Sequence, residues 1–260
     1  MKQLFTNILF FVACTVILTA RAQNDTINPL WSTTGPAILS NGAMQWDNIL
    51  EWNHMNASGS SGITQYNSIN GNSVLRLGIG SKSELTLGLT GGNTTYHYDN
   101  GINNGYDTTM GSLSPQVGMR MSLYDGKGWL PQITFNTHIS YNTYFGGDSF
   151  VQPSLGLEFR NRIGKRWAID YSIGYVWSKL NYGSVGSYIT GSIFARWLVT
   201  DKLMIGLGIN DYKAQMSILY QASDCLQLSL QGNIEGISGP VVSKDWYAHD
   251  LMLGISWRIK

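Results

Sequence analysis

Charged residues are scarce in this chain of 260 residues: 17 Lys and Arg and 16 Asp and Glu make up 13% of it, whereas a typical soluble protein has about 25%. The near balance of the two signs, a formal net charge of +1, gives no field that would attract a polyanion, so we expect no nucleic-acid partner. An aromatic content of 12% excludes a disordered chain. Beyond its first twenty residues the sequence has no apolar run of about 20 residues, which excludes a helical membrane protein.

Cysteine is also nearly absent, with Cys14 and Cys225 alone. Residues 1–22 combine Lys2, a short apolar stretch and the small-x-small pattern Ala20-Arg21-Ala22, which predicts a cleaved signal peptide and export. Cys14 leaves with this segment, and a lone Cys225 cannot form a disulfide within the chain. The exported protein must therefore be stabilised in another way.

What the sequence has instead is glycine, aromatic residues and a regular alternation. It contains 30 Gly, 9 Trp and 14 Tyr. Between Trp167 and Trp177 the odd positions are all apolar or aromatic, whereas the even ones are mostly small or polar. A helix would mix the two sets, so the period of two predicts a strand with two unlike faces.

The same alternation recurs along the chain and predicts twelve strands, with an uncertainty of two to four residues at each boundary. The expected strands are 43–54, 72–79, 83–97, 110–124, 129–143, 150–161, 166–179, 186–199, 202–211, 214–222, 225–236 and 246–259.

The connections between these strands indicate how they are arranged. Tight turns follow the second, fourth, sixth, eighth and tenth strands, whereas longer links rich in Asn, Ser and Gly follow most of the others, above all at 54–70 and 98–109. Short turns at one end and longer loops at the other are typical of outer-membrane barrels. We therefore expect an all-β fold, a transmembrane antiparallel up-and-down β-barrel of about 12 strands. The alternative is a soluble β-sandwich, whose solvent face should carry many Lys and Glu.

Aromatic residues gather near the two ends of the expected strands, as the aromatic girdles of a membrane barrel do. The ten steps from Trp167 to Trp177 span about 33 Å along a strand. At a tilt of about 40° this projects to roughly 25 Å, the height of the apolar band. The girdle candidates are Trp129, Trp167, Trp177, Trp197, Trp246 and Trp257.

These features divide the chain into a signal peptide (1–22), a periplasmic N-terminal segment (23–41) and an outer-membrane β-barrel (42–260). The expected location is the outer membrane of a Gram-negative envelope. The expected partners are its lipid bilayer, the barrel-assembly machinery, which would recognise the C-terminal strand, and a small-molecule solute.

Several short stretches also resemble a known family, the outer-membrane transporters of the MetA pathway of phenol degradation. They are Thr34-Gly35-Pro36 followed by Gly42, residues 75–79 (LRLGI) with 83–88 (SELTLG), 123–131 (LYDGKGWLP) and 254–258 (GISWR). The resemblance covers the mature chain and implies an outer-membrane, porin-like barrel that transports small hydrophobic compounds. Residues 28–31 (NPLW) replace a charged Asp-Arg-Pro-Gly of the relatives, so we expect no salt-bridged N-terminal plug. The chain ends Ile259-Lys260 in place of a terminal aromatic residue.

Function would be located on the inward face, where unpaired charge is costly. The ionisable residues expected there are Arg76, Glu84, Arg120, His138, Glu158, Arg160, Asp170, Arg196 and Arg258. Two interpretations remain open: a structural network of ion pairs that fills the lumen, or a polar passage that filters solutes by charge. Inward glycines such as Gly208 and Gly254 would either leave room for solute or accommodate neighbouring side chains.

Enzyme chemistry has few candidate residues. His249 and Asp250 are adjacent and point to opposite faces of a strand, and His97 with Asp99 lies near the rim. The sequence has no Gly-x-Ser-x-Gly motif, and its four His form no metal-ligand pattern. We therefore expect no catalytic residues, no metal and no cofactor. In a third interpretation the barrel is structural or adhesive, and residues 54–70 form a binding loop.

Overall fold

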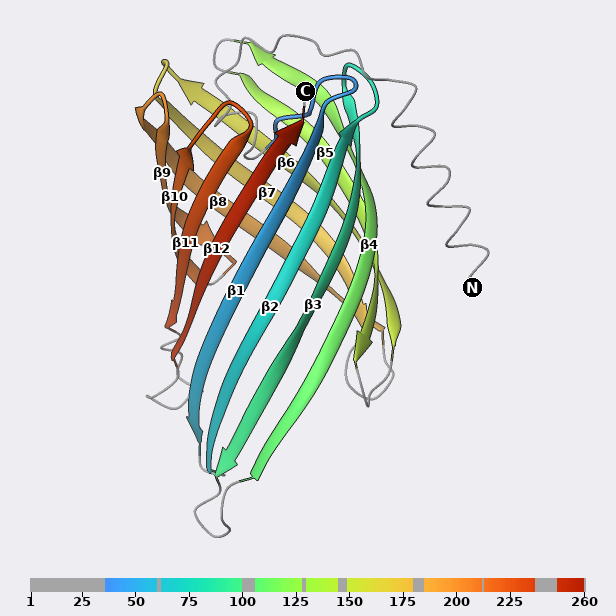
Figure 1. The fold of residues 1–260 in the computed structure, drawn as a ribbon, viewed down its shortest axis with the longest axis vertical. Helices are drawn as coiled ribbons and strands as arrows, with labels where there is room; N and C mark the ends of the chain where they lie inside the picture. Colours follow the sequence, from blue (N-terminus) through green and yellow to red (C-terminus); the bar gives the residue numbers. More distant parts are fainter. Residues whose placement is uncertain are drawn as a thin grey trace.

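The computed structural model describes residues 36–59, 62–99, 106–127, 130–144, 149–179, 185–211, 213–236 and 247–259. In this part of the chain, twelve strands form a closed barrel (Figure 1). The strands are β1 (Met44–Gly59), β2 (Gly62–Gly78), β3 (Ser83–Asp99), β4 (Tyr106–Lys127), β5 (Leu130–Tyr144), β6 (Phe150–Ile163), β7 (Trp167–Lys179), β8 (Val185–Thr200), β9 (Leu203–Asn210), β10 (Lys213–Gln221), β11 (Leu226–Gly236) and β12 (Tyr247–Ile259).

Each strand pairs antiparallel with its neighbours in the sequence, and β1 closes the barrel against β12. The expected transmembrane up-and-down barrel is thus confirmed, and each expected strand overlaps one observed strand. Two register shifts, between Ser122 and Tyr124 and between Leu198 and Thr200, mark bulges close to the short-turn end. Among the described residues, no helix has the length and apolar character needed to cross a membrane.

Two expected loops are wrong in extent. β1 and β2 continue through residues 54–70 as a ladder that pairs out to Gly59 and Gly62, and β4 already begins at Tyr106. The pairing continues there, but the apolar alternation stops, because a strand that leaves the bilayer meets water on both faces. Residues 54–59 and 62–70 are therefore strand, and the loop expected there is corrected. That this surface binds a partner stays a prediction.

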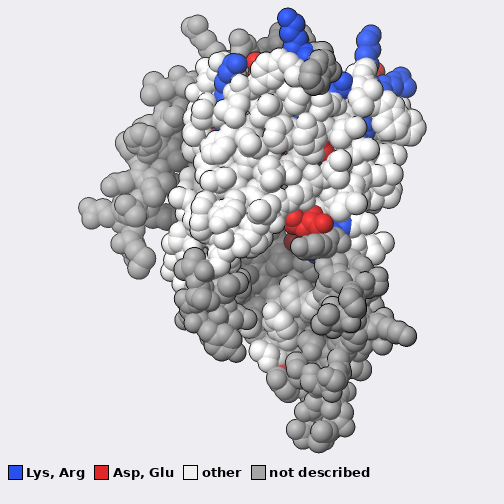
Figure 2. All heavy atoms as spheres, turned by 180° about the vertical axis from the view of Figure 1, so that it is seen from behind, with Lys and Arg blue, Asp and Glu red and all other residues white. Residues whose placement is uncertain are grey.

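The two faces of the wall differ as the alternation predicts. Large apolar side chains are exposed on the outside, with Ile173 52% and Leu253 52% exposed, whereas Asp170 on the inside is 6% exposed. Figure 2 shows Lys and Arg gathered at the end that carries the short turns, and below them a face that is mostly uncharged apart from a group of Asp and Glu near mid-height. This outer face suits lipid because it presents few charges to the hydrocarbon.

Strand length varies around the barrel. β1 to β4 have 16 to 22 residues, whereas β9, β10 and β11 have 8, 9 and 11. In Figure 1 the long strands reach much further at the loop end, which is the lower end in that view. The wall is therefore tall on one side of the lumen and low on the other.

Candidate functional site in the lumen

A continuous polar network crosses the inner wall from β2 to β6. Glu84 is fully buried at its centre and accepts hydrogen bonds from Arg76 Nε and Arg120 Nη1, each at 2.9 Å. Arg120 also donates to Glu158 Oε2 at 2.6 Å, and Glu158 Oε1 accepts from Asn136 at 2.8 Å. The register explains these contacts, because Arg120 stands directly opposite both Glu84 and Asn136 on the neighbouring strands.

A second cluster joins β6, β7 and β8 around Asp170. Arg160, which is 2% exposed, binds both carboxylate oxygens of Asp170, at 2.6 and 2.7 Å, and Arg196 Nε donates to the same group. The Arg196 guanidinium also lies 5.3 Å from the ring centroid of Phe194. Two guanidinium groups thus share the carboxylate of Asp170.

The remaining two predicted lumen residues contact neutral side chains. Arg258 on β12 donates to Gln45 Oε1 at 3.1 Å, and Gln45 donates onward to Asp47 at 2.8 Å. His138 on β5 contacts the hydroxyl of Ser154 at 2.8 Å. The structure thus connects seven of the nine predicted residues into two charged clusters and places Arg258 and His138 apart from them.

The chain's own residues 36–39 dock onto the first cluster, inside the short-turn end of the barrel. The carbonyl of Ala37 accepts from Arg76 at 3.1 Å and from Arg120 at 3.2 Å, and the Leu39 N–H donates to Glu84 at 2.9 Å. Thr134 donates to the carbonyl of Pro36. Main-chain atoms of the segment thereby complete the hydrogen bonding of the buried charges. Residues 28–31, where we expect no salt-bridged plug, lie outside the described part of the chain.

The opposite side of the short-turn end is apolar. Ala168, Leu198, Met204 and Leu219 form a buried cluster, with Met204 fully enclosed. Apolar side chains on β7 to β10 therefore occupy one side of the short-turn end, and residues 36–39 with the ionic network on β2 to β6 occupy the other.

Further toward the loop end, the middle parts of β9 to β11 contribute no charged side chain of their own to the inner face, and the guanidinium of Arg196 on β8 reaches to 3.4 Å from the place of a Cβ on Gly206. The inward residues are Gly206, Gly208, Gln215, Ser217, Gln227, Ser229 and Gln231. A Cβ on Gly208 would lie 2.6 Å from the Phe194 ring, and one on Gly254 would lie 2.2 Å from Ser229 Oγ. At these two positions glycine accommodates neighbouring side chains.

A third polar cluster, which was not predicted from the sequence, lies near the loop end. Lys213 Nζ lies 2.7 Å from Asp250 Oδ2, which also accepts from Asn233. The amide of Asn53 satisfies both of its polar atoms when its nitrogen donates to Asp250 at 2.8 Å and to Glu51 at 3.1 Å. The alternation along β12 could have identified Asp250, because it lies on the same face as Arg258, but the sequence suggested it only as a partner of His249.

Aromatic side chains occupy the outer face near the short-turn end. Trp167 and Trp197 are cross-strand partners whose rings stack at 5.4 Å, and Trp257 pairs with Trp46. Trp177 lies near the loop end of β7, and its ring centroid lies 4.5 Å from that of Tyr175. Trp129 and Trp246, the other two girdle candidates, lie outside the described residues.

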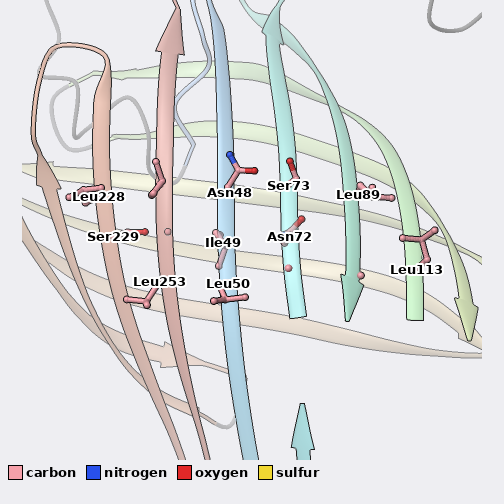
Figure 3. A pocket seen from close by; sticks show the side chains of 14 residues that line it. Asn48, Ile49, Leu50, Asn72, Ser73, Leu89, Leu113, Leu228, Ser229 and Leu253 are labelled. Carbon is pink, nitrogen blue, oxygen red and sulfur yellow. The ribbon is translucent and has the colours of Figure 1, made fainter. Parts of the chain in front are cut away.

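A cavity of about 770 Å³ lies against the β11–β12–β1–β2–β3–β4 wall. Most of its lining belongs to the outward-facing set, and Figure 3 shows Leu50, Leu89, Leu113, Leu228 and Leu253 arranged around it. Gly71 and Gly91, which are opposite each other on β2 and β3, leave its centre without side chains. This cavity is an apolar depression of the lipid-facing surface and is separate from the lumen clusters.

The remaining candidates for chemistry are dispersed. His97 contacts Asp107 at 2.6 Å near the loop end of β3. In the described part of the chain, no group of three or more His, Cys, Asp or Glu could hold a metal ion. The charged clusters of the lumen are fixed and largely buried along the inner wall.

Comparison with known proteins identifies the fold and nothing narrower. No family model and no curated protein matches the sequence. The solved outer-membrane channel from Pseudomonas putida F1 is similar with a TM-score of 0.59 and 11% identity, over 86% of this chain and 97% of that chain. The translocator domain of the autotransporter NalP from Neisseria meningitidis has a TM-score of 0.54 at 10% identity, over 84% and 88% of the two chains.

The transport unit of the autotransporter AIDA-I from Escherichia coli has a TM-score of 0.51 at 12% identity, over 83% and 89%. The chain has the fold of an outer-membrane β-barrel. Because both a channel and autotransporter units share it, the fold alone does not select a function.

Proposed function

We propose that the protein is a passive outer-membrane channel for a small solute, with hydrophobic or aromatic compounds as the first candidates. The observation that carries the proposal is the division of the inner wall. Charges are fixed on β2 to β8, whereas β9 to β11 present Gly, Ser and Gln over the middle of the barrel. A polar surface without charge is one that a weakly polar solute can pass at low cost of desolvation.

The route begins at the low wall of the loop end, where Lys213 and Asp250 lie. It follows the Gly, Ser and Gln surface of β9 to β11 toward the short-turn mouth and passes the Asp170 cluster, whose two guanidinium groups favour anionic or electron-rich groups. No cofactor or energy source takes part, so the direction of flow follows the concentration gradient. The similar P. putida barrel is itself a channel, and the family resemblance implies hydrophobic compounds.

Single-channel recording in planar bilayers tests the proposal, together with uptake of small aromatic compounds into liposomes. We expect steady conductance whose ion selectivity changes in Arg120→Ala and in Glu158→Gln. Lys82→Ala is the matched control, because Lys82 pairs with Asp125 at the exposed short-turn end and not in the lumen. A correctly folded barrel that neither conducts nor admits aromatic compounds would overturn the channel.

The docked segment 36–39 favours a second candidate, a structural or adhesive barrel with a plugged lumen. Its main chain is held by three charged side chains, Arg76, Glu84 and Arg120. A silent, heat-resistant barrel in the recordings would support this alternative.

The weakest alternative is a lipid- or peptide-modifying enzyme. Its best candidate pair is Ser154 with His138, since a hydroxyl beside an imidazole is the core of a hydrolase site. Turnover of phospholipid or peptide that is lost in Ser154→Ala would support this activity over the channel.

A further inference from the structure

Two histidines face each other across the seam that closes the barrel. His54 on β1 and His249 on β12 are direct cross-strand partners, and their ring centroids lie 5.1 Å apart. Both belong to the outward-facing sets of their strands, because Trp52 and Leu251, two residues away on each strand, are exposed on the same face. The pair therefore lies on the outer surface, toward the loop end of the apolar band.

Neighbouring side chains hold the two imidazoles in place. The Trp52 ring stacks on His54 at 6.1 Å with an interplanar angle of 16°, and it lies 5.8 Å from His249. Asn67, on the other side of β1, places its Oδ1 2.6 Å from His54 Nδ1. An amide oxygen only accepts, so in this arrangement Nδ1 carries the proton and Nε2 carries the lone pair.

That arrangement matches the surroundings of a metal-binding histidine. Ligating imidazoles almost always donate their second N–H to an oxygen, which fixes the tautomer and the orientation of the ring. Directly opposed residues on antiparallel strands have Cβ atoms about 4.5–5.5 Å apart, close enough for two imidazoles to reach one ion at about 2.0–2.1 Å.

We propose that His54 and His249 form a two-ligand site for a divalent transition-metal ion, Zn²⁺, Ni²⁺ or Cu²⁺, whose other positions are taken by water. Imidazole nitrogen suits these ions, whereas Mg²⁺ and Ca²⁺ require oxygen ligands. The bound ion joins the first strand to the last. It therefore clamps the seam, and it stabilises the closed barrel because it binds a geometry that exists only after closure.

Calorimetric titration of the untagged protein in detergent tests the site. The background is Cys225→Ser, because the exposed thiol of Cys225 would itself bind metal. We expect one Ni²⁺ or Zn²⁺ per chain, no response to Mg²⁺, and an affinity at least about tenfold lower in His54→Gln and in His249→Gln. Asn67→Ala should lower the affinity by about tenfold or more while both ligands remain, as loss of an orienting partner does.

His97→Gln is the matched control, since His97 pairs with Asp107 on β3 and β4, away from the seam. Binding that persists in both glutamine variants, or that is lost in the His97 variant, would overturn the proposal. A second measurement does not depend on those variants. Cu²⁺ should quench tryptophan fluorescence in the parent protein and quench it clearly less in Trp52→Phe, and equal fractional quenching in the two proteins contradicts the site.

Discussion

Asp170 shows how single residues hold this lumen together. Its carboxylate is shared between Arg160 and Arg196, and both the acid and Arg160 are buried. One buried and one partly exposed guanidinium group share this carboxylate, so the cluster is sensitive, because removal of Asp170 takes away the charge that both groups bind in a region of low polarity.

We expect Asp170→Asn to lower the free energy of unfolding by about 3–5 kcal/mol, the usual cost of breaking a buried pair. Urea unfolding in lipid vesicles, followed by tryptophan fluorescence, measures it. Asp125→Asn is the control, because Asp125 forms an exposed pair with Lys82, which is expected to contribute about 0–1 kcal/mol. Equal losses in the two variants would show that the Asp170 cluster is not a stabilising unit.

At the scale of elements, the start of β1 and the end of β2 fix the docked segment 36–39. The N–H of Gly42 donates to the carbonyl of Gly78, and Gly78 donates to Ala43. A Cβ on Gly78 would lie 1.9 Å from the carbonyl oxygen of Ser40. Only glycine allows the two backbones to approach this closely.

Gly78→Ala should therefore push residues 36–40 away from the wall and expose the segment. A cysteine at position 37, in the Cys225→Ser background, reports the change through its rate of reaction with a water-soluble thiol reagent. We expect at least about a tenfold faster reaction in Gly78→Ala. Gly80→Ala is the control, since a Cβ there meets nothing within 4 Å. An unchanged rate in both variants would mean that the close approach at Gly78 does not hold the segment.

For the whole molecule, the decisive property is that neighbouring residues on a strand experience different solvents. Ser172 bonds to Ser192 on the inner wall, whereas Ile173, the next residue, is 52% exposed on the outside. The same relation holds for Ser229 and Leu228 on the far side of the barrel.

Cysteine labelling in membranes tests this arrangement. Ser172→Cys and Ser229→Cys should react with water-soluble probes, and Ile173→Cys and Leu228→Cys with lipid-soluble probes, all in the Cys225→Ser background. Reaction of Ser172→Cys with lipid-soluble probes alone would mean that the register of β7 is wrong.

The fold could be predicted from the sequence where contact with lipid imposes an apolar alternation on the strands. Inside the bilayer one face of each strand must be apolar, so the alternation around Trp167 and Leu253 locates the strands. Past Trp52 that constraint ends, so the sequence shows no apolar alternation there although the β1–β2 hairpin continues.

The candidate site was predictable in part, for a similar reason. Strand phase identifies Glu84 and Arg120 as inward residues, but the contact between them depends on register, which the turns set. The docking of residues 36–39 was not predictable, because main-chain atoms make most of its contacts and carry no residue-specific signal.

The seam between β1 and β12 also has a kinetic consequence. Every other pairing joins strands that are adjacent in the sequence, whereas the bond from Arg258 to Gln45 spans 213 residues. Contacts of such long range form slowly, because they require most of the chain to be ordered first. Until they form, β1 and β12 present unpaired edges, the state most prone to wrong association. We therefore expect closure of this seam to limit the rate of assembly. We also expect the barrel-assembly machinery to protect these two edges until they pair.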